Sequence, residues 1–376
     1  MKESALYVHI PFCDHKCIYC DFYSIITSYN TNSFLNSVKK EIKYYSDLYS
    51  KDRIYTSIFF GGGTPSLMEP EYLWEIIATL RKNYSISEDP EVTMETNPGT
   101  VNKEKLKSFR EMGINRISIG IQSFHDDELK FLTRIHNKKT AIETVYSAKE
   151  AGFENISIDL IFNLPGQTKR KWEENLEKAI KLPIKHLSAY SLILERGTIL
   201  NKMVLDNKVK MQDNDHDADL YEMTIDFMHD SGFKQYEVSN FAKPGYECRH
   251  NNAYWHYKDY LSFGTSSHSF VNGKRWWNFS SLKRYISEIN KNGFAVAGSE
   301  LVNEREKLTE YVMLSLRSSG LELVEFKKMF GADWINEKYD YIKKLMRRNL
   351  VTLDEKYLRL TKKGYAVCDE ILKEIL

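Results

Sequence analysis

Residues 156–162 read Ile-Ser-Ile-Asp-Leu-Ile-Phe, a short run in which β-branched and other apolar residues dominate. A run of this length and composition is typical of a strand that is buried on both faces of a parallel sheet. Similar runs recur on both sides of it along the first half of the chain. The expected strands are Leu6–Ile10, Tyr55–Phe60, Glu91–Glu95, Arg116–Ile121, Ser157–Phe162 and His186–Leu192.

Amphipathic stretches separate these strands and are long enough to form helices. The expected helices are Ser33–Tyr49, Pro70–Asn83, Asn102–Met112, Thr140–Ala151 and Lys169–Lys181. Regular alternation of strand and helix predicts an α/β fold with a parallel sheet and right-handed crossovers. Six such units suffice for a partial (β/α)6 barrel and fall short of the roughly eight units in a closed one. Functional residues of such a fold are expected at the carboxyl ends of the strands.

The length of 376 residues suggests more than one domain. We expect the partial barrel over residues 1–195, a less regular extension over 196–304, and a small C-terminal domain over 305–376. The last region shows three helical patterns, then a hairpin and a final helix, which resembles a winged helix. Such a domain could bind DNA, but the balanced charge of the chain favours an accessory packing or docking role.

The charge of the chain is balanced, with 53 Lys and Arg against 52 Asp and Glu. This balance argues against broad electrostatic binding to nucleic acid or to anionic lipid. No run of about 18 apolar residues is present, so we expect no transmembrane helix. The first residues lead almost directly into the first strand, without the pattern of a signal peptide, which favours a cytoplasmic location.

Three of the five cysteines, Cys13, Cys17 and Cys20, lie close together directly after the first expected strand. Thiolates are soft ligands that suit iron–sulfur clusters or zinc. Three of them would leave one iron of a [4Fe–4S] cluster open for another ligand, whereas zinc would need His9 or His15 as its fourth ligand. Three buried free thiols are the alternative without a metal. The specific spacing favours the cluster.

Polar residues and glycines gather at the carboxyl ends of four expected strands. The segment 61–64, Gly-Gly-Gly-Thr, follows the second strand, Glu95 ends the third, Gln122 follows the fourth, and Asp159 lies in the fifth. Glycine lets the backbone approach a ligand closely because it has no side chain. The recurrence of such residues at the ends of four strands indicates a functional site at this edge of the sheet.

The spacing Cys-x3-Cys-x2-Cys, with Tyr19 before the last cysteine, resembles that of the radical S-adenosylmethionine (SAM) superfamily. Longer segments resemble the coproporphyrinogen oxidase-like branch of that superfamily, and within it the heme chaperones. These segments are residues 7–13, 60–66, 95–99, 115–124, 134–136, 159–168, 236–242 and 250–255. The C-terminal region is similar too, so the resemblance extends over nearly the whole chain.

The resemblance implies a [4Fe–4S] cluster held by Cys13, Cys17 and Cys20, with SAM on the open iron. It also implies which residues contact SAM. By position these are Tyr7, Gly62, Gly63, Thr64, Glu95, Gln122, Arg134 and Asp159. Glu95 could accept hydrogen bonds from the ammonium or the ribose of SAM, and Arg134 could pair with its carboxylate.

Two functions belong to this branch. The oxidases convert coproporphyrinogen III to protoporphyrinogen IX by oxidative decarboxylation through a 5′-deoxyadenosyl radical, and they have a further cysteine where this chain has Phe22. The segment 250–255, His-Asn-Asn-Ala-Tyr-Trp, instead resembles the heme chaperones, which bind heme and transfer it to respiratory heme proteins. We therefore expect a heme chaperone and not an oxidase. Its partners would be heme, respiratory acceptors and an electron donor for the cluster; no nucleic acid is expected, and a homodimer is left open.

His250 is the first candidate for a heme ligand, because imidazole is a common axial ligand of heme iron. Cys248, two residues earlier, is the second. The alternative is that His250 only forms hydrogen bonds to its neighbours.

Two residues depart from the pattern of the resembled family. Thr133 and Asn163 stand where relatives usually have glycine. Both add a Cβ atom at positions where close backbone approach is typical.

Overall fold

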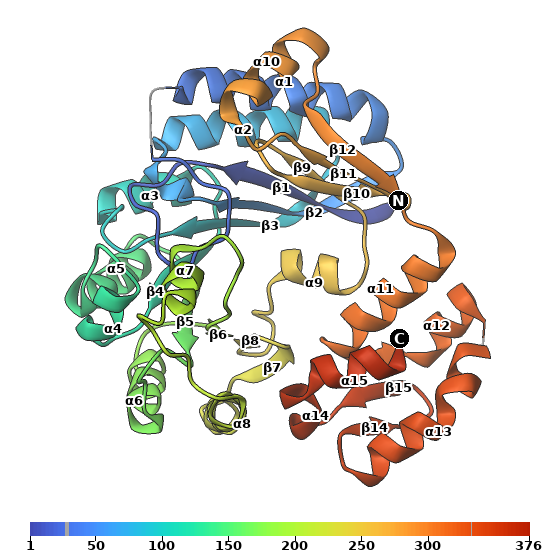
Figure 1. Cartoon of the computed structure of the whole chain (residues 1–376). Helices are drawn as coiled ribbons and strands as arrows, with labels where there is room; N and C mark the ends of the chain where they lie inside the picture. Colours follow the sequence, from blue (N-terminus) through green and yellow to red (C-terminus); the bar gives the residue numbers. More distant parts are fainter. Residues whose placement is uncertain (27–29, 332) are drawn as a thin grey trace.

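The computed structural model describes residues 1–26, 30–331 and 333–376. Six parallel strands form its centre and follow one another in the sheet in chain order (Figure 1). They are β1 (Lys2–Ile10), β2 (Arg53–Gly62), β3 (Ile86–Thr96), β4 (Arg116–Gln122), β5 (Asn155–Phe162) and β6 (His186–Ser191). The α/β fold with a partial (β/α)6 barrel is thereby confirmed.

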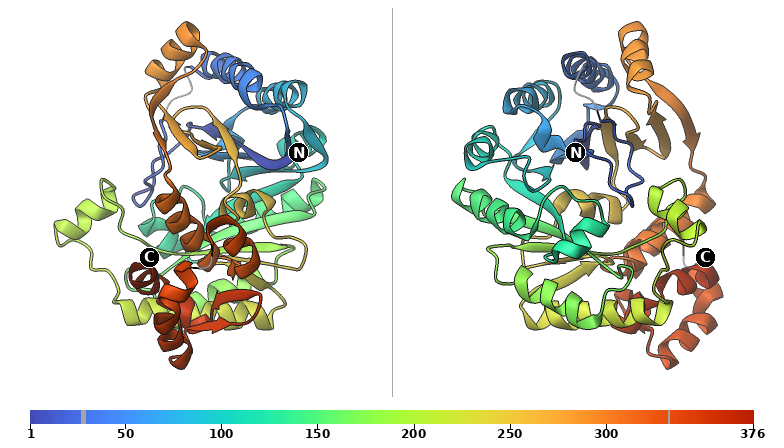
Figure 2. Two further views of the ribbon diagram at one scale, coloured as in Figure 1. Left: turned by 90° about the vertical axis from the view of Figure 1, so that its right-hand side faces the viewer. Right: turned by 60° about the vertical axis from the view of Figure 1, so that its left-hand side comes forward.

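Helices follow these strands and cover the outer face of the sheet in an arc (Figure 2). They are α1 (Thr31–Tyr49), α2 (Pro70–Asn83), α3 (Lys103–Glu111), α4 (Asp126–Phe131), α5 (Lys138–Glu150) and α6 (Lys169–Ala179). Asn102, Asn137 and Thr168 stand just before α3, α5 and α6, and each side chain accepts a hydrogen bond from a backbone N–H of the first turn. Such N-caps explain why these helices begin where they do. The buried face of α1 carries Phe34 and Val38, which are 0% exposed.

The irregular region 196–304 extends the sheet at both edges. At one edge β9 (Tyr260–Phe263) pairs in parallel with β1, and β10 (His268–Val271), β11 (Lys274–Asn278) and β12 (Val296–Leu301) continue in antiparallel pairs. At the other edge β8 (Asn240–Ala242) and β7 (Lys234–Glu237) pair antiparallel beside β6. These strands have three to six residues, too few for hydrophobic alternation to reveal them in the sequence.

Earlier in the chain, directly after β2, the short 3-10 helix η1 (Pro65–Leu67) is formed. The region 196–304 also contains helices. The helices are α7 (Ile199–Leu205), α8 (Asn214–Asp230), α9 (Arg249–Trp255) and α10 (Leu282–Asn292). Of these, α9 lies on the side of the sheet that faces away from α1 and α2 (Figure 1). It packs there against β1 and β2.

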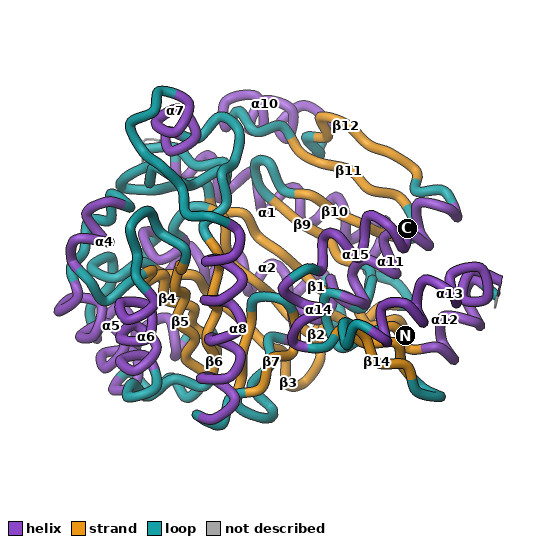
Figure 3. The backbone as a smooth tube through the Cα atoms, turned by 60° about the horizontal axis from the view of Figure 1, so that its bottom comes forward, coloured by secondary structure: helices purple, strands orange, loops and turns teal. Residues whose placement is uncertain are grey.

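The C-terminal elements pack around an apolar core of their own, centred on Leu316, Phe326 and Ile342. They are α11 (Glu304–Leu316), β13 (Leu321–Glu322), α12 (Leu323–Phe330), α13 (Asp333–Arg347), β14 (Val351–Leu353), β15 (Tyr357–Leu360), α14 (Lys362–Ala366) and α15 (Cys368–Ile375). The strands form a small antiparallel sheet in the order β13-β15-β14. Figure 3 shows these helices grouped on one side, opposite α4–α6. A hydrogen bond from the Val238 N–H to the Arg317 carbonyl, 2.9 Å, joins this unit to the barrel.

Among the residues described, no helix is both long enough and apolar enough to cross a membrane.

Candidate functional site

The three clustered cysteines lie in the loop between β1 and α1. The base of this loop is closed by a bridge between Phe12 and Ile25, in which the Cys13 N–H donates to the Ile25 carbonyl at 3.0 Å. Further along, the Cys20 N–H donates to the Cys17 carbonyl at 3.2 Å. All three thiols are free and partly exposed. Burial raises the pKa of the Cys20 thiol, and the nearby thiols of Cys17 and Cys13 raise it further.

A glycine turn after β2 packs directly against this loop. The Gly63 N–H donates to the Ile10 carbonyl and the Thr64 N–H to the Phe12 carbonyl, each at 2.7 Å. A Cβ atom on residue 63 would lie only 2.6 Å from the Phe12 carbonyl oxygen, and Gly62 has a φ of +108°. Only glycine fits both positions, so the turn and the start of the cysteine loop are built as one unit.

A chain of polar contacts links two of the cysteines through the strand ends. Arg134 Nη1 donates to the Cys17 sulfur at 3.4 Å, and its Nη2 donates to Asn97 Oδ1 at 2.6 Å. Asn97 Nδ2 donates in turn to Thr64 Oγ1 at 2.9 Å, and Thr64 Oγ1 lies 3.5 Å from the Cys13 sulfur. Asn97 lies in the segment 95–99, which resembles the radical SAM branch, but it was not among the expected site residues.

Two carboxylates lie deeper on the inner face of the sheet. Glu95 accepts a hydrogen bond from the Gly62 N–H at 3.1 Å, and burial, together with the nearby Asp159, raises its pKa to about 7. Asp159 accepts a hydrogen bond from Ser118 at 3.1 Å, and burial raises its pKa as well. Two carboxyls that disfavour each other's charge form a site that is poised for a cation.

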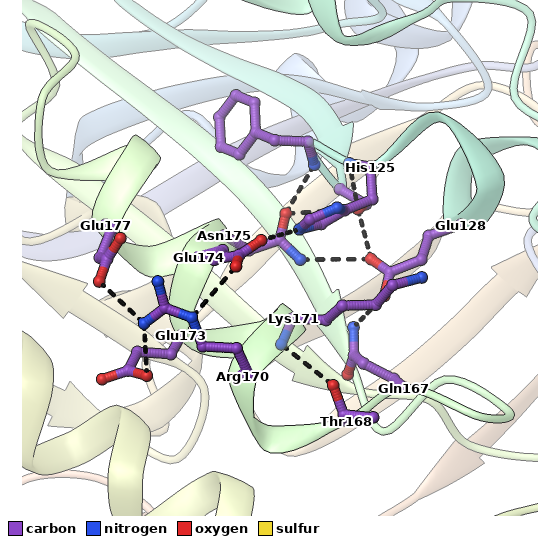
Figure 4. A network of polar contacts seen from close by, with 12 residues as sticks. His125, Glu128, Gln167, Thr168, Arg170, Lys171, Glu173, Glu174, Asn175 and Glu177 are labelled. Carbon is purple, nitrogen blue, oxygen red and sulfur yellow. Dashed lines mark hydrogen bonds and ion pairs between the residues drawn. The ribbon is translucent and has the colours of Figure 1, made fainter.

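Gln122 ends β4 with a φ of +69°, at a point where the pairing with β5 shifts register. Behind it, a buried polar network anchors the next residues to α6 (Figure 4). Ser123 Oγ donates to Glu128, and Asn175 accepts from the Phe124 N–H at 2.7 Å and donates to Glu128 at 3.2 Å. The two residues directly after Gln122 are therefore fixed to α4 and α6 by buried hydrogen bonds.

Tyr7 lies on the inner face of β1. Its ring stacks on Phe59 at 6.0 Å between centroids and on His250 at 6.1 Å, and its hydroxyl lies 3.4 Å from His9 Nδ1. The other ring nitrogen of His9 bonds to the Tyr23 carbonyl at 2.9 Å, and burial lowers the pKa of His9 to about 4. Both His9 nitrogens are thus already engaged and do not offer a zinc ligand.

The two heme-ligand candidates are buried in and beside α9. His250 is 1% exposed, with Nδ1 bonded to Ser57 at 3.0 Å and Nε2 to Tyr254 at 2.9 Å. Cys248 is 0% exposed and its thiol donates to Glu91 at 3.3 Å. In this arrangement neither side chain presents a free coordinating atom.

Comparison with known proteins identifies the family. The model of the radical SAM superfamily matches residues 7–179, and that of the HemN C-terminal domain matches residues 302–367. The chain is 34% identical to the heme chaperone HemW of Bacillus subtilis, over 99% of each chain. It is 30% identical to the heme chaperone HemW of Lactococcus lactis, over 100% of this chain and 98% of that one. The chain belongs to the HemW family of the radical SAM superfamily.

Among solved structures, coproporphyrinogen III oxidase HemN of Escherichia coli superposes with a TM-score of 0.84 at 24% identity, over 100% of this chain and 90% of that chain. This likeness shows a shared fold. This chain thus has the fold of that protein, including the small C-terminal unit.

Membership in the radical SAM superfamily implies a [4Fe–4S] cluster and SAM as cofactors. The donor set of the cysteine loop fits such a cluster. Among the described residues, no three His, Cys, Asp or Glu side chains converge closely enough for a single metal ion. A cubane cluster needs no such convergence, because each cysteine binds its own iron.

The positive φ angles explain two departures noted in the sequence. Thr133 has a φ of +57° and Asn163 a φ of +61°. Glycine adopts this left-handed region without cost, which agrees with the expectation that glycine suits these positions. Thr133 offsets part of the cost, since its hydroxyl accepts a hydrogen bond from the Ile18 N–H at 3.3 Å.

Proposed function

We propose that this protein is a heme chaperone that carries a [4Fe–4S] cluster and SAM, and that binds heme and passes it to other proteins. The observation that carries this proposal is the full-length similarity to two proteins named heme chaperone HemW. Phe22, which stands on the cysteine loop where the oxidases have a further cysteine, favours the same function over coproporphyrinogen oxidation.

We propose Cys13, Cys17 and Cys20 as the cluster ligands. Their support is that all three are free, lie in one loop and are partly exposed. When bound, the cluster supplies an iron with an open coordination position and a transferable electron. The Arg134 contact to the Cys17 sulfur would persist as a charge-assisted hydrogen bond to a thiolate.

We propose that SAM lies between the cysteine loop and the strand ends. The residues that would contact it are Tyr7, Gly62, Gly63, Thr64, Glu95, Gln122, Arg134 and Asp159. Arg134 Nε is buried and has no hydrogen-bond partner among the described residues, so this side chain retains donor capacity for a carboxylate. Glu95 is suited to an ammonium or a ribose hydroxyl, and the two glycines leave room for the ligand beside the backbone.

The partners and the domain division belong to the same proposal. We expect respiratory heme proteins as acceptors and an electron donor for the cluster. Residues 1–195 would hold the cofactors, 196–304 would complete the sheet edges, and 305–376 would serve as a docking domain. A cytoplasmic location would suit the five free cysteines, because thiols stay reduced there.

Heme binding and transfer test this function directly. Protein with a reconstituted cluster is titrated with heme under anaerobic conditions, and then mixed with an apo-cytochrome acceptor. We expect saturable heme binding and loss of heme to the acceptor. In parallel, the reduced protein is incubated with SAM and coproporphyrinogen III. Formation of protoporphyrinogen IX without heme transfer would overturn the chaperone function in favour of the oxidase.

A further inference from the structure

A cavity of about 380 Å³ opens beside the cysteine loop, between β1 and the added strands β9 and β10. Its size falls within the roughly 300–1,000 Å³ that ligand sites usually have. Four tyrosines line it, Tyr7, Tyr23, Tyr254 and Tyr260, and the cysteine loop also contributes Phe22. The serines Ser262, Ser266 and Ser267 complete the lining on the side of β9 and β10. Phe22 is 63% exposed, which is a large exposure for a phenylalanine. The cavity therefore offers an aromatic surface next to the proposed SAM site, with Tyr7 as a shared wall.

The walls of this cavity are held rigidly by α9. The buried imidazole of His250 bonds to Ser57 on one side and to the Tyr254 hydroxyl on the other. The Tyr254 ring meets Tyr260 edge to face, with 4.6 Å between centroids. His250 thus positions Tyr254 from behind the cavity lining, and Tyr254 itself lines the cavity.

One imidazole of the cavity is available for coordination. His268 also lines this cavity; it is exposed at the start of β10, and its ring stacks on Trp277 at 5.9 Å. No hydrogen bond of its side chain occurs within residues 1–26, 30–331 and 333–376. The other cavity histidine, His9, has both nitrogens engaged. Partial burial and the nearby Arg275 lower the pKa of His268, which keeps the ring in the neutral form that binds metals.

We propose that the heme cargo binds in this cavity, with His268 as an axial ligand and the macrocycle against Tyr254 and Tyr260. This site deepens the proposed function and rests on it. It places the heme beside the cofactor site, and it gives the region around α9 a supporting role instead of a ligating one.

The charges at the rim agree with a cargo site that must release its ligand. Asp21 lines the cavity, and Lys16 Nζ bonds to the Phe22 carbonyl at 2.5 Å. Arg275 and Glu300, which both act on His268, form an ion pair at 2.7 Å, so the rim is close to neutral and offers the heme propionates little net attraction. Binding would come from apolar contact and one iron–imidazole bond, which allows transfer to an acceptor with more contacts.

The test is a heme titration of the cluster-reconstituted full-length protein, followed by absorption and resonance Raman spectroscopy. We expect His268→Ala to weaken heme affinity by at least about tenfold and to change the spin state of the iron. We also expect His268→Gly to regain the original spectrum when free imidazole is added. The exposed His256→Ala serves as the matched control and is expected to match the unmodified protein.

The possible outcomes distinguish a failure of the proposed heme site from a failure of the proposed chaperone function. Identical heme affinity and Raman spectrum in His268→Ala and unmodified protein would overturn the site while leaving the chaperone function intact. Loss of the axial signature in His250→Ala but not in His268→Ala would also overturn it. Failure of the unmodified protein to bind heme at all would overturn the proposed function itself, and the site with it.

Discussion

Two polar regions on the inner side of the barrel differ in what their polar atoms do. At the strand ends, Arg134 and Thr64 reach toward cysteine sulfurs, and Arg134 still has a buried N–H without a partner among the described residues. Around α9, by contrast, both nitrogens of His250 are bonded, and Glu91 accepts from the Cys248 thiol and from two backbone N–H groups. At the strand ends a buried donor remains open to a ligand, whereas His250 and Cys248 already have their hydrogen-bond partners.

This difference separates binding residues from supporting ones. A buried group with spare donors lowers its free energy by meeting a ligand, whereas a satisfied group would have to break bonds first. The segment 250–255 suggested a heme ligand from the sequence, but its geometry favours a structural role.

The largest effect is expected at the cysteine loop. Cys17→Ser should abolish the iron–sulfur cluster, because two thiolates cannot hold it in place of three. Iron and sulfide analysis after anaerobic reconstitution measures the loss. Cys368→Ser, a buried cysteine of the C-terminal core, is the control and should keep full iron and sulfide. Equal cluster content in both variants would contradict the ligand assignment.

The supporting role of α9 predicts a stability effect. His250→Ala removes a buried ring and leaves Ser57 and Tyr254 without a partner, so unfolding should become easier by about 2–4 kcal/mol. Chemical denaturation measures this change. The exposed His268→Ala should stay within about 0.5 kcal/mol of the unmodified protein. If His250→Ala were as stable as His268→Ala, the two regions would not differ as described.

The spare donor of Arg134 predicts an effect on SAM binding. Arg134→Gln should weaken SAM affinity by about 1.5–3 kcal/mol, the usual range for a hydrogen bond to a charged group. Equilibrium binding to the reconstituted protein measures it. Arg170→Gln, which removes a surface arginine of α6, should bind SAM unchanged. Equal affinities in the two variants would place the SAM carboxylate elsewhere.

The smallest effect concerns pH. The pKa of Glu95 is raised to about 7 by burial and by Asp159. A cationic ligand prefers the carboxylate form, so SAM affinity should fall as pH drops through about 7. Between pH 8 and pH 6 we expect a loss of up to about tenfold, and Glu95→Gln should flatten the profile. A profile that is unchanged by this substitution would exclude Glu95 as the titrating group.

The sequence predicted the parts of the fold that depend on local pattern. The six central strands and helices α1, α2, α3, α5 and α6 were predicted, because strongly apolar runs alternate with amphipathic ones. Helix α4 was not expected, since its six residues are too few to show a helical period. Strands β7–β12 were missed, since short edge strands owe their conformation to their neighbours in the sheet. The last helix was expected as one piece, and it is divided at Val367 into α14 and α15.

The candidate site shows the same limit. The rule that functional residues follow parallel strands was enough to select Glu95, Gln122 and Asp159 as candidates. The link made by Asn97 between Arg134 and Thr64 could not be predicted, because it joins three loops that only the folded chain brings together. Whether an imidazole is free or bonded, as His268 and His250 show, is likewise a property of tertiary structure.

Electron paramagnetic resonance of the reduced, anaerobically reconstituted protein shows whether three thiolates leave one iron of the cluster open toward SAM. If they do, we expect a [4Fe–4S]⁺ signal whose g-values change when SAM is added. A signal that is the same with and without SAM, or protein that holds no inorganic sulfide, would contradict it.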